Sequence, residues 1–101
     1  MRGNMASITS SLRQKLKSDA HHLKPLVRIG HKGLTDTLKK AVDDALESHE
    51  LIKLKFMEYK DDKKQLSYKI AADTSSEVIG FIGNTVILYR ENKDKAESEK
   101  D

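Results

Sequence analysis

Residues 25–35 read PLVRIGHKGLT, and the order of apolar, glycine and polar residues in this stretch decides which fold the chain is expected to adopt. The apolar run Leu26–Ile29 is too short for a helix and ends at a glycine, so it predicts a strand. Gly30–Gly33 predicts a tight loop, because glycines let the backbone turn sharply. Thr35 is a favourable N-cap, and it predicts that a helix follows. The stretch therefore predicts a strand, a glycine loop and a helix in succession.

Apolar periodicity predicts helices on both sides of this stretch. Upstream, apolar residues recur at the four- and three-residue spacing of an amphipathic helix, at Ile8, Leu12, Leu16, Ala20 and Leu23. Thr9 or Ser10 can cap this helix, and Pro25 ends it. The helix after the glycine loop runs to about Ser48. A third, weaker apolar stripe predicts a helix that starts near Asp61, where acidic residues are favourable.

The remaining segments predict strands. Leu51–Phe56 is an apolar run interrupted by two lysines. Glu77–Ile82 and Thr85–Tyr89 are β-branched runs separated by Gly83-Asn84, which predicts a hairpin with a two-residue turn. In that register three pairs are expected: Ile82 with Thr85, Phe81 with Val86, and Ile79 with Leu88. The core face of the hairpin is then expected to carry Ile79, Phe81, Val86 and Leu88.

The element order predicts an α/β fold: a compact α-β-α-β-α-β-β single domain with a four-stranded mixed sheet and helical cover. A chain of 101 residues and 11.4 kDa suits one such domain. We place the domain at residues 8–90, between a disordered or vector-derived segment at 1–7 and a disordered charged tail at 91–101. One common core is expected to contain Phe81, Leu88, Val42, Leu46, Leu54 and Leu16.

Composition excludes several classes of protein. Hydrophobic residues make up 37% of the chain and charged residues 35%, which predicts a small core under a heavily charged surface. The absence of cysteine excludes thiolate catalysis, disulfides and cysteine-ligated zinc. No apolar stretch approaches the roughly 18 residues of a membrane-spanning helix, and the N-terminus has no signal-peptide pattern. We expect a soluble, cytoplasmic monomer that has no cofactor and does not contact a membrane.

The net charge of +3 is distributed unevenly along the chain. Residues 8–40 contain eight basic and two acidic residues, whereas residues 41–90 contain seven basic and nine acidic ones. A basic surface of this kind favours a polyanionic partner. Charged residues can also serve solubility alone, so charge leaves both interpretations open.

The Gly30–Gly33 loop is where charge and backbone geometry favour the same chemistry. Glycines let backbone N–H groups approach a ligand closely, and the helix N-terminus behind the loop adds unpaired donors and a positive dipole end. Lys32 adds a charge, and His31 can stack on a base or donate a hydrogen bond. The combination suits phosphate, as in the GxxG clamp of KH modules, although Asp36 competes for the anion position. Two glycines around a polar pair also describe an ordinary turn.

Catalysis is not indicated. His21 and His22 are adjacent, so on a helix they point about 100° apart and cannot easily ligate one metal together. The sequence contains no nucleophile elbow, zinc-protease motif or nucleotide-binding P-loop. The aromatic residues Tyr59, Tyr68 and Tyr89 lack the alternate spacing of an RRM stacking platform, so we expect them to pack in the core or at its rim.

Three separated blocks of sequence resemble a known family. They read HHLKPLVRIGHKGLT at 21–35, HELIKLK at 49–55, and VIG and ILYR at 78–80 and 87–90. In this order and at these intervals they resemble the CRM domain (chloroplast RNA splicing and ribosome maturation) in its stand-alone bacterial YhbY form. The resemblance runs from about Ser10 to Arg90. It implies an RNA-binding domain similar to KH domains and to the C-terminal domain of translation initiation factor three, associated with immature large ribosomal subunits.

The resemblance also implies which residues contact RNA. These are the loop and two basic residues before it: Gly30, His31, Lys32, Gly33, Arg28 and Lys24. The family loop usually reads Gly-Lys-x-Gly, whereas here His31 is second and Lys32 third, so the positive charge is displaced by one residue. The charge pattern adds Arg13 and Lys17 of the first helix.

The sequence therefore leaves two functional hypotheses. The first is a non-catalytic protein that contacts ribosomal RNA through the GxxG loop and a basic face during large-subunit assembly. The second is an assembly adaptor whose main contact is a protein and whose basic face aids only solubility.

Overall fold

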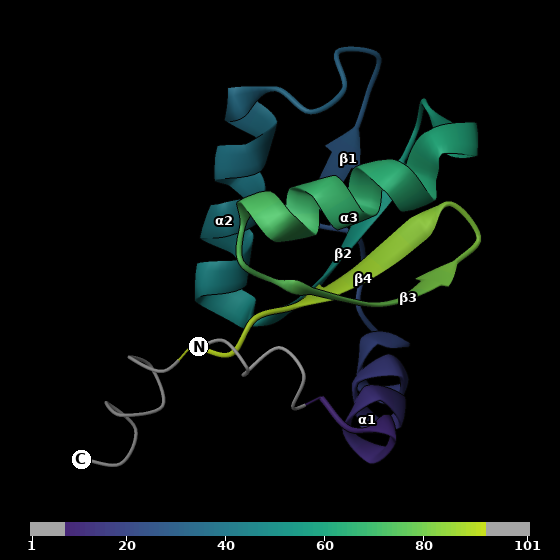
Figure 1. The fold of residues 1–101 in the computed structure, drawn as a ribbon, viewed down its shortest axis with the longest axis vertical. Helices are drawn as coiled ribbons and strands as arrows, with labels where there is room; N and C mark the ends of the chain where they lie inside the picture. Colours follow the sequence, from purple (N-terminus) through teal and green to yellow (C-terminus); the bar gives the residue numbers. More distant parts are fainter. Residues whose placement is uncertain (1–7, 93–101) are drawn as a thin grey trace.

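The computed structural model describes residues 8–92, in which helices surround one sheet (Figure 1). The elements in chain order are α1 (Ser10–Ala20), β1 (Val27–Ile29), α2 (Asp36–His49), β2 (Leu51–Phe56), the 3-10 turn η2 (Lys60–Asp62), α3 (Lys63–Asp73), β3 (Glu77–Ile82) and β4 (Thr85–Tyr89). This order confirms the predicted α-β-α-β-α-β-β architecture. Within residues 8–92, no helix has the length and apolar character needed to cross a membrane.

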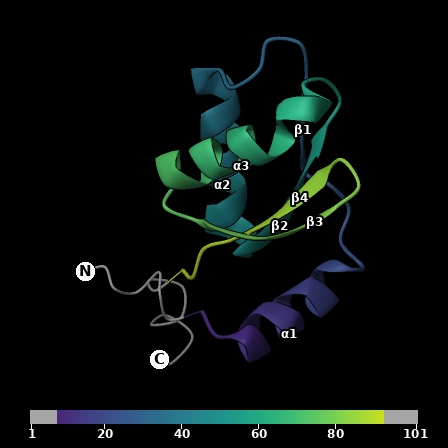
Figure 2. The same ribbon diagram turned by 45° about the vertical axis from the view of Figure 1, so that its right-hand side comes forward.

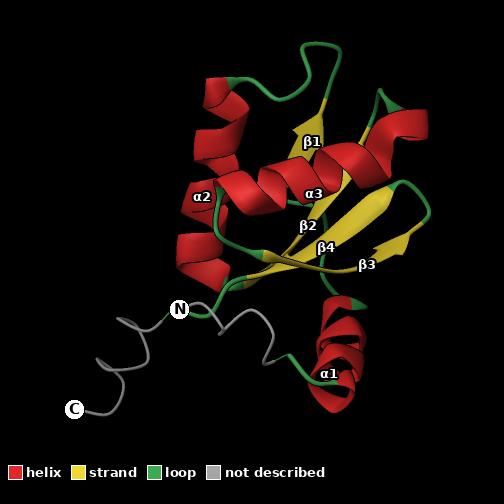
Figure 3. Cartoon of the chain, viewed as in Figure 1, coloured by secondary structure: helices red, strands yellow, loops and turns green. Residues whose placement is uncertain are grey.

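The strands form one mixed sheet in the order β1-β2-β4-β3 (Figure 3). β1 and β2 are parallel, with Val27 opposite Leu54, and α2 connects them. A parallel pair needs such a crossover, because the chain must return to the same end of the sheet before the next strand begins. β4 runs antiparallel to both β2 and β3. The sheet confirms the predicted four-stranded mixed arrangement.

Helices cover both faces of this sheet, with α2 and α3 on one face and α1 on the other (Figure 2). The larger core, between the sheet and α2 and α3, includes Val42, Leu46, Leu54, Phe56, Ile70 and Leu88. The smaller core, under α1, contains Leu16, Ala20, Ile79 and Ile87. The prediction that Leu16 shares one core with Leu46 and Leu88 is therefore wrong. Alternate strand residues face opposite sides of a sheet, and α1 packs on the second side.

A β-bulge in β3 changes the predicted hairpin register at one point. The structure confirms two predicted pairs: Ile82 with Thr85 and Phe81 with Val86. Leu88, however, lies opposite Val78 instead of Ile79, because Ile79 is the extra residue of the bulge. The side chain of Ile79 packs in the smaller core under α1. The other three residues of the predicted core face do pack with the larger core.

Side-chain caps begin the first two helices where the sequence predicts them. The Thr9 hydroxyl accepts a hydrogen bond from the Leu12 N–H at 3.0 Å, and the Thr35 hydroxyl accepts one from the Leu38 N–H at 3.0 Å. These bonds satisfy N–H groups that a helix start leaves without an intrahelical partner. α3 starts two residues after the predicted position at Asp61, because η2 precedes it.

The C-terminal end of the described chain is tied to α2. Arg90 Nη1 donates to the Asp43 carboxylate at 2.6 Å and to the Thr74 carbonyl at 2.8 Å. The Asn92 N–H donates to the Glu50 carboxylate at 2.9 Å. Hydrogen bonds thus extend to Asn92, and the placement of the domain at residues 8–90 stays a prediction. Residues 1–7 and 93–101, for which disorder is predicted, lie outside the described residues.

Candidate functional site

The Gly30–Gly33 loop joins β1 to the N-terminus of α2 (Figure 1). The Gly33 N–H donates to the Gly30 carbonyl at 3.0 Å, and the Thr35 N–H donates to the Gly33 carbonyl at 3.1 Å. Four N–H groups between residues 30 and 34 donate to no acceptor within residues 8–92: those of Gly30, His31, Lys32 and Leu34. The loop is therefore a closed turn that carries unpaired donors beside a helix N-terminus, where the dipole favours an anion.

Gly30 differs from the other glycines that the structure describes. Gly33 and Gly83 have φ of 71° and 58°, in the left-handed region that favours glycine. A Cβ on Gly80 would lie 2.8 Å from Lys17 Cε, so a side chain there would require the flexible end of Lys17 to move. Gly30 is exposed, its φ lies outside the left-handed region, and a Cβ there would meet no atom within 4 Å. Neither backbone strain nor packing accounts for a glycine at position 30.

Tyr59 supports the loop from the side of β2 and α3. Its hydroxyl donates a hydrogen bond to the His31 carbonyl. Its ring lies against the loop, since a Cβ on Gly33 would be 3.6 Å from Tyr59 Cε2. Tyr59 itself has φ of 58°, an uncommon conformation for a bulky residue. The prediction that the tyrosines pack in the core or at its rim is confirmed for Tyr89 and wrong for Tyr59 and Tyr68, which are 42% and 58% exposed and pack against neither core. The contact of Tyr59 with the loop has no signal in the sequence.

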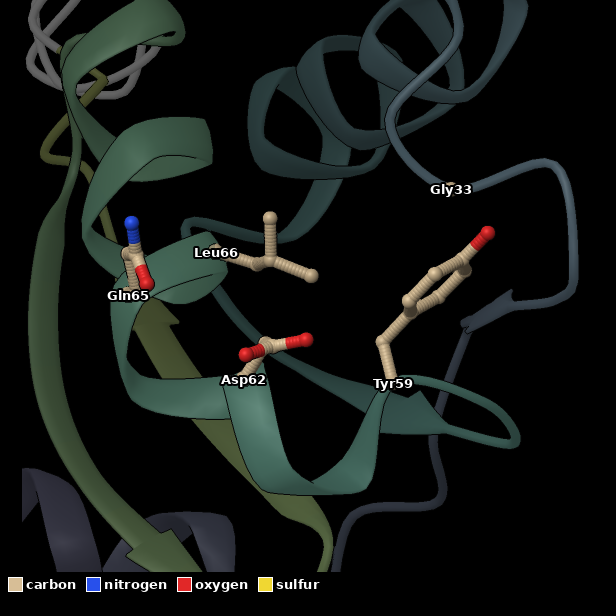
Figure 4. Close-up of a pocket in the computed structure, with 5 residues that line it drawn as sticks. All are labelled: Gly33, Tyr59, Asp62, Gln65 and Leu66. Atoms are coloured by element: carbon tan, nitrogen blue, oxygen red, sulfur yellow. The ribbon is translucent and has the colours of Figure 1, made fainter.

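A pocket opens beside this contact. It has a volume of about 370 Å³ and is lined by Gly33, Tyr59, Asp62, Gln65 and Leu66 (Figure 4). The lining combines the glycine loop with an aromatic ring, an aliphatic side chain and two polar groups. Asp62 precedes α3 as its N-cap, yet its side chain makes no capping hydrogen bond.

The basic residues of the N-terminal third fall into two groups, those that form an ion pair and those that do not. Lys15, Lys39 and Lys40 form ion pairs with carboxylates. The pair between Lys39 and Asp73, at 3.0 Å, lowers the pKa of the Asp73 carboxyl through its hydrogen bond. The residues of this region that form no ion pair within residues 8–92 are Arg13, Lys17, Lys24, Arg28 and Lys32.

Arg28 is one of two unpaired cations that lie side by side on the sheet. Its partner across the parallel ladder is Lys55, and both side chains are exposed. Their strand neighbours pack in the larger core, so Arg28 and Lys55 lie on the opposite face, which α1 covers only in part. Sequence reasoning missed Lys55, although the alternation of lysine and apolar residues in β2 places it on this face. Like charges directly opposite each other destabilise a ladder unless an anion lies nearby.

Arg13 and Lys17 lie away from the loop and contact β3 instead. Arg13 Nη1 donates to the carbonyls of Val78 and Ile79, at 2.8 and 3.0 Å, at the position of the bulge. The Lys17 stem packs over Gly80. The loop and α1 lie at opposite ends of the molecule in Figure 1. The structure therefore does not bring these two predicted contacts together with the loop.

The other six predicted residues lie in β1 or near its ends. Arg28 is within β1, the four loop residues follow its C-terminal end, and Lys24 precedes its N-terminal end. Within residues 8–92, no three histidine, aspartate or glutamate side chains cluster in a way that could hold a metal ion. The arrangement offers unpaired backbone donors, unpaired cations and a pocket, all of which are groups that can bind a ligand.

Known proteins share both the sequence and the fold. The family model of the CRS1 / YhbY (CRM) domain matches residues 8–90. The chain is 33% identical over 93 residues to "Probable RNA-binding protein YqeI" of Bacillus subtilis, which covers 91% of this chain and 97% of the relative. It is 35% identical over 91 residues to "RNA-binding protein" of Haemophilus influenzae, which covers 89% of this chain and 92% of the relative.

A solved structure shows the same fold. The solution structure of SAV1595 from Staphylococcus aureus matches with a TM-score of 0.73 and 37% sequence identity, and the match covers 82% of this chain and 88% of that one. The family match and the curated relatives extend over nearly all of the described residues. The chain belongs to the CRS1/YhbY (CRM) domain family.

Proposed function

We propose that this chain is a non-catalytic RNA-binding protein that holds a phosphate of ribosomal RNA on the Gly30–Gly33 loop during assembly of the large ribosomal subunit in the cytoplasm. The names of the Bacillus subtilis and Haemophilus influenzae relatives, which describe RNA-binding proteins, support the class of ligand. The family resemblance described above supports the ribosomal context.

The observation that carries the proposal is the glycine at position 30. The folded chain would accept a side chain there, because no atom lies within 4 Å of the Cβ and φ is outside the left-handed region. At an exposed site where neither φ nor packing requires a glycine, the missing side chain allows a ligand to approach the backbone closely. The unpaired N–H groups of His31 and Lys32 lie directly after it. A phosphate oxygen can accept from both, as anions do at helix N-termini.

Unpaired cations extend this site along the sheet. Lys32 lies in the loop, and Arg28 and Lys55 lie side by side at the ends of β1 and β2 that lead toward it. An RNA backbone that passes from the loop over this pair would neutralise two like charges that have no carboxylate partner within residues 8–92. Phosphate contacts of this kind position RNA without reading its sequence.

A second candidate function is a protein-contacting adaptor, and one feature favours it. Leu23, Leu26 and Leu51 line a groove of about 150 Å³ at the start of β1, and Leu26 is 50% exposed. Exposed leucines beside a groove are typical of protein contacts. This groove lies at the opposite end of β1 from the glycine loop, so substitutions can separate the two functions.

Binding of a single-stranded RNA to the full chain over a salt series tests the proposal. Lys32→Ala should weaken binding and reduce the slope of log affinity against log salt by about 0.7, the value for one lost contact to a single strand. Lys64→Ala is the matched control, because Lys64 is an exposed lysine of α3 without an ion pair within residues 8–92. Equal affinities and slopes for the two folded variants would contradict a phosphate site at the loop.

Sedimentation of cell extracts tests the ribosomal part of the proposal. Association with large-subunit particles should fall steeply as the salt concentration rises, because RNA contacts release counterions. Salt-resistant association that is lost in Leu26→Ser would instead support the adaptor.

A further inference from the structure

The pocket beside the loop has features that phosphate binding does not need. Tyr59, Leu66 and Asp62 surround a space of about 370 Å³ that opens next to Gly33 (Figure 4). A phosphate held by backbone N–H groups uses neither an aromatic ring nor a carboxylate. The nucleotide attached to that phosphate carries a base, and an unstacked base is an aromatic ring with a hydrogen-bonding edge.

Tyr59 is held in place before any ligand arrives. Its backbone adopts φ of 58°, its hydroxyl donates to the His31 carbonyl, and its ring edge lies against Gly33. A bulky residue in the left-handed region is strained, and such strain is concentrated at functional sites. Tyr59 is 42% exposed and belongs to neither core cluster, so it is not needed to fill the core. Tyr59 therefore presents a fixed aromatic surface at the mouth of the pocket.

Asp62 contributes an acceptor that the fold does not use. An N-cap aspartate normally accepts from the N–H groups of the first helical turn, but the Asp62 side chain makes no such bond. It forms no ion pair within residues 8–92, although Lys60 and Lys63 are close in sequence. Figure 4 shows its carboxylate turned into the space between Leu66 and the Tyr59 ring. An ionised carboxylate is an acceptor only, so a partner in this pocket must supply donors.

We infer that this pocket receives one unstacked guanine of the bound RNA, with the base against Tyr59 and Leu66 and its donor edge on the Asp62 carboxylate. Guanine alone among the four RNA bases presents two adjacent donors, N1–H and the N2 amino group, on its Watson–Crick edge. These match the two oxygens of a carboxylate as a bidentate, charge-assisted pair. On adenine and cytosine the single donor lies beside a ring nitrogen acceptor, and on uracil it lies between two carbonyls. The inference rests on the proposed RNA binding by the loop.

Fluorescence anisotropy with short RNAs tests the inference. The probes are single-stranded uridine octamers in which one central residue is guanosine, inosine or adenosine; inosine lacks only the N2 amino group of guanosine. The full-length chain should bind the guanosine RNA about tenfold more tightly than the inosine RNA, as expected for one hydrogen bond to a charged group. Adenosine should bind no better than uridine at the same position.

Two matched variants test whether the Asp62 carboxylate causes the preference for guanosine. In Asp62→Asn the preference for guanosine over inosine should fall below about twofold, because the charged acceptor is lost. Asp61→Asn removes the same charge from the neighbouring residue, which does not line the pocket, and should keep the full preference. Thermal unfolding of both variants should match the unsubstituted chain, since the Asp62 side chain makes no hydrogen bond within residues 8–92.

The outcomes separate this inference from the proposed function. Equal binding of the three RNAs by the unsubstituted chain, with weaker binding of all three by Lys32→Ala, would overturn the guanine pocket and leave the phosphate site standing. An unchanged preference for guanosine in folded Asp62→Asn would also overturn it. Failure of the unsubstituted chain to bind any of the RNAs would overturn both.

Discussion

Alanine substitutions at Gly30 and Gly33 should shift stability in opposite directions, although the two glycines lie in one loop. Alanine at position 33 must adopt φ near 71°, which costs about 1–2 kcal/mol for a residue with a Cβ. The new methyl group would lie 3.6 Å from Tyr59 Cε2, an ordinary contact distance, so crowding adds little. At either position alanine restricts the unfolded chain and thereby stabilises the fold by about 0.4–1 kcal/mol.

The free energy of unfolding should therefore fall by about 0.5–1 kcal/mol in Gly33→Ala and rise by about 0.4–1 kcal/mol in Gly30→Ala. Urea denaturation followed by circular dichroism measures both values. RNA affinity measured on the same samples should fall in Gly30→Ala, because the methyl group occupies the space that a phosphate must enter. A variant that is more stable but binds more weakly is the expected signature. Equal destabilisation by the two substitutions, or unchanged RNA affinity in Gly30→Ala, would refute the reasoning.

Two further substitutions test how the sheet is held together. Arg13→Ala should lower the free energy of unfolding by about 1–3 kcal/mol, because it leaves the carbonyls of Val78 and Ile79 without their donor, and the affinity of the folded variant for RNA should not change. A loss of RNA affinity without a loss of stability would assign Arg13 to the RNA surface after all. Phe81→Ala should cost about 2–3 kcal/mol by urea denaturation, somewhat less than for a fully buried phenylalanine, because Phe81 is only partly buried against the larger core. A loss below about 0.5 kcal/mol would mean that its side chain does not pack there.

Local sequence patterns predicted most of the fold because the deciding signals are local. Apolar spacing, threonine caps at Thr9 and Thr35, and the Gly83-Asn84 turn each act within a few residues, and the structure has all of them. The bulge at Ile79 was not predictable in this way. The carbonyls of Val78 and Ile79 at this bulge accept hydrogen bonds from Arg13 of α1, which lies more than sixty residues away in sequence. The same long-range packing placed Leu16 in a second core.

The candidate site also has features that the local sequence predicts and features that it does not. The loop glycines and Lys32 could be singled out from residues 30–33 alone, because turn geometry and charge are properties of the local sequence. The contact between Tyr59 and His31 joins segments 28 residues apart and depends on a left-handed conformation at Tyr59 that no local residue pattern marks. The sequence also did not predict that the Asp62 carboxylate makes no capping hydrogen bond, since an aspartate before a helix predicts a cap.

Amide chemical shifts of the ¹⁵N-labelled full chain, recorded during titration with a single-stranded RNA octamer, test the central claim most directly. If the loop holds the RNA backbone, the amide signals of His31, Lys32 and Leu34 should move most, because their N–H groups are unpaired in the folded chain and would gain phosphate acceptors. Signals of Ser10–Ala20, at the opposite end of the molecule, should stay in place. Loop signals that do not move while those of α1 or of the groove around Leu26 do would contradict the claim.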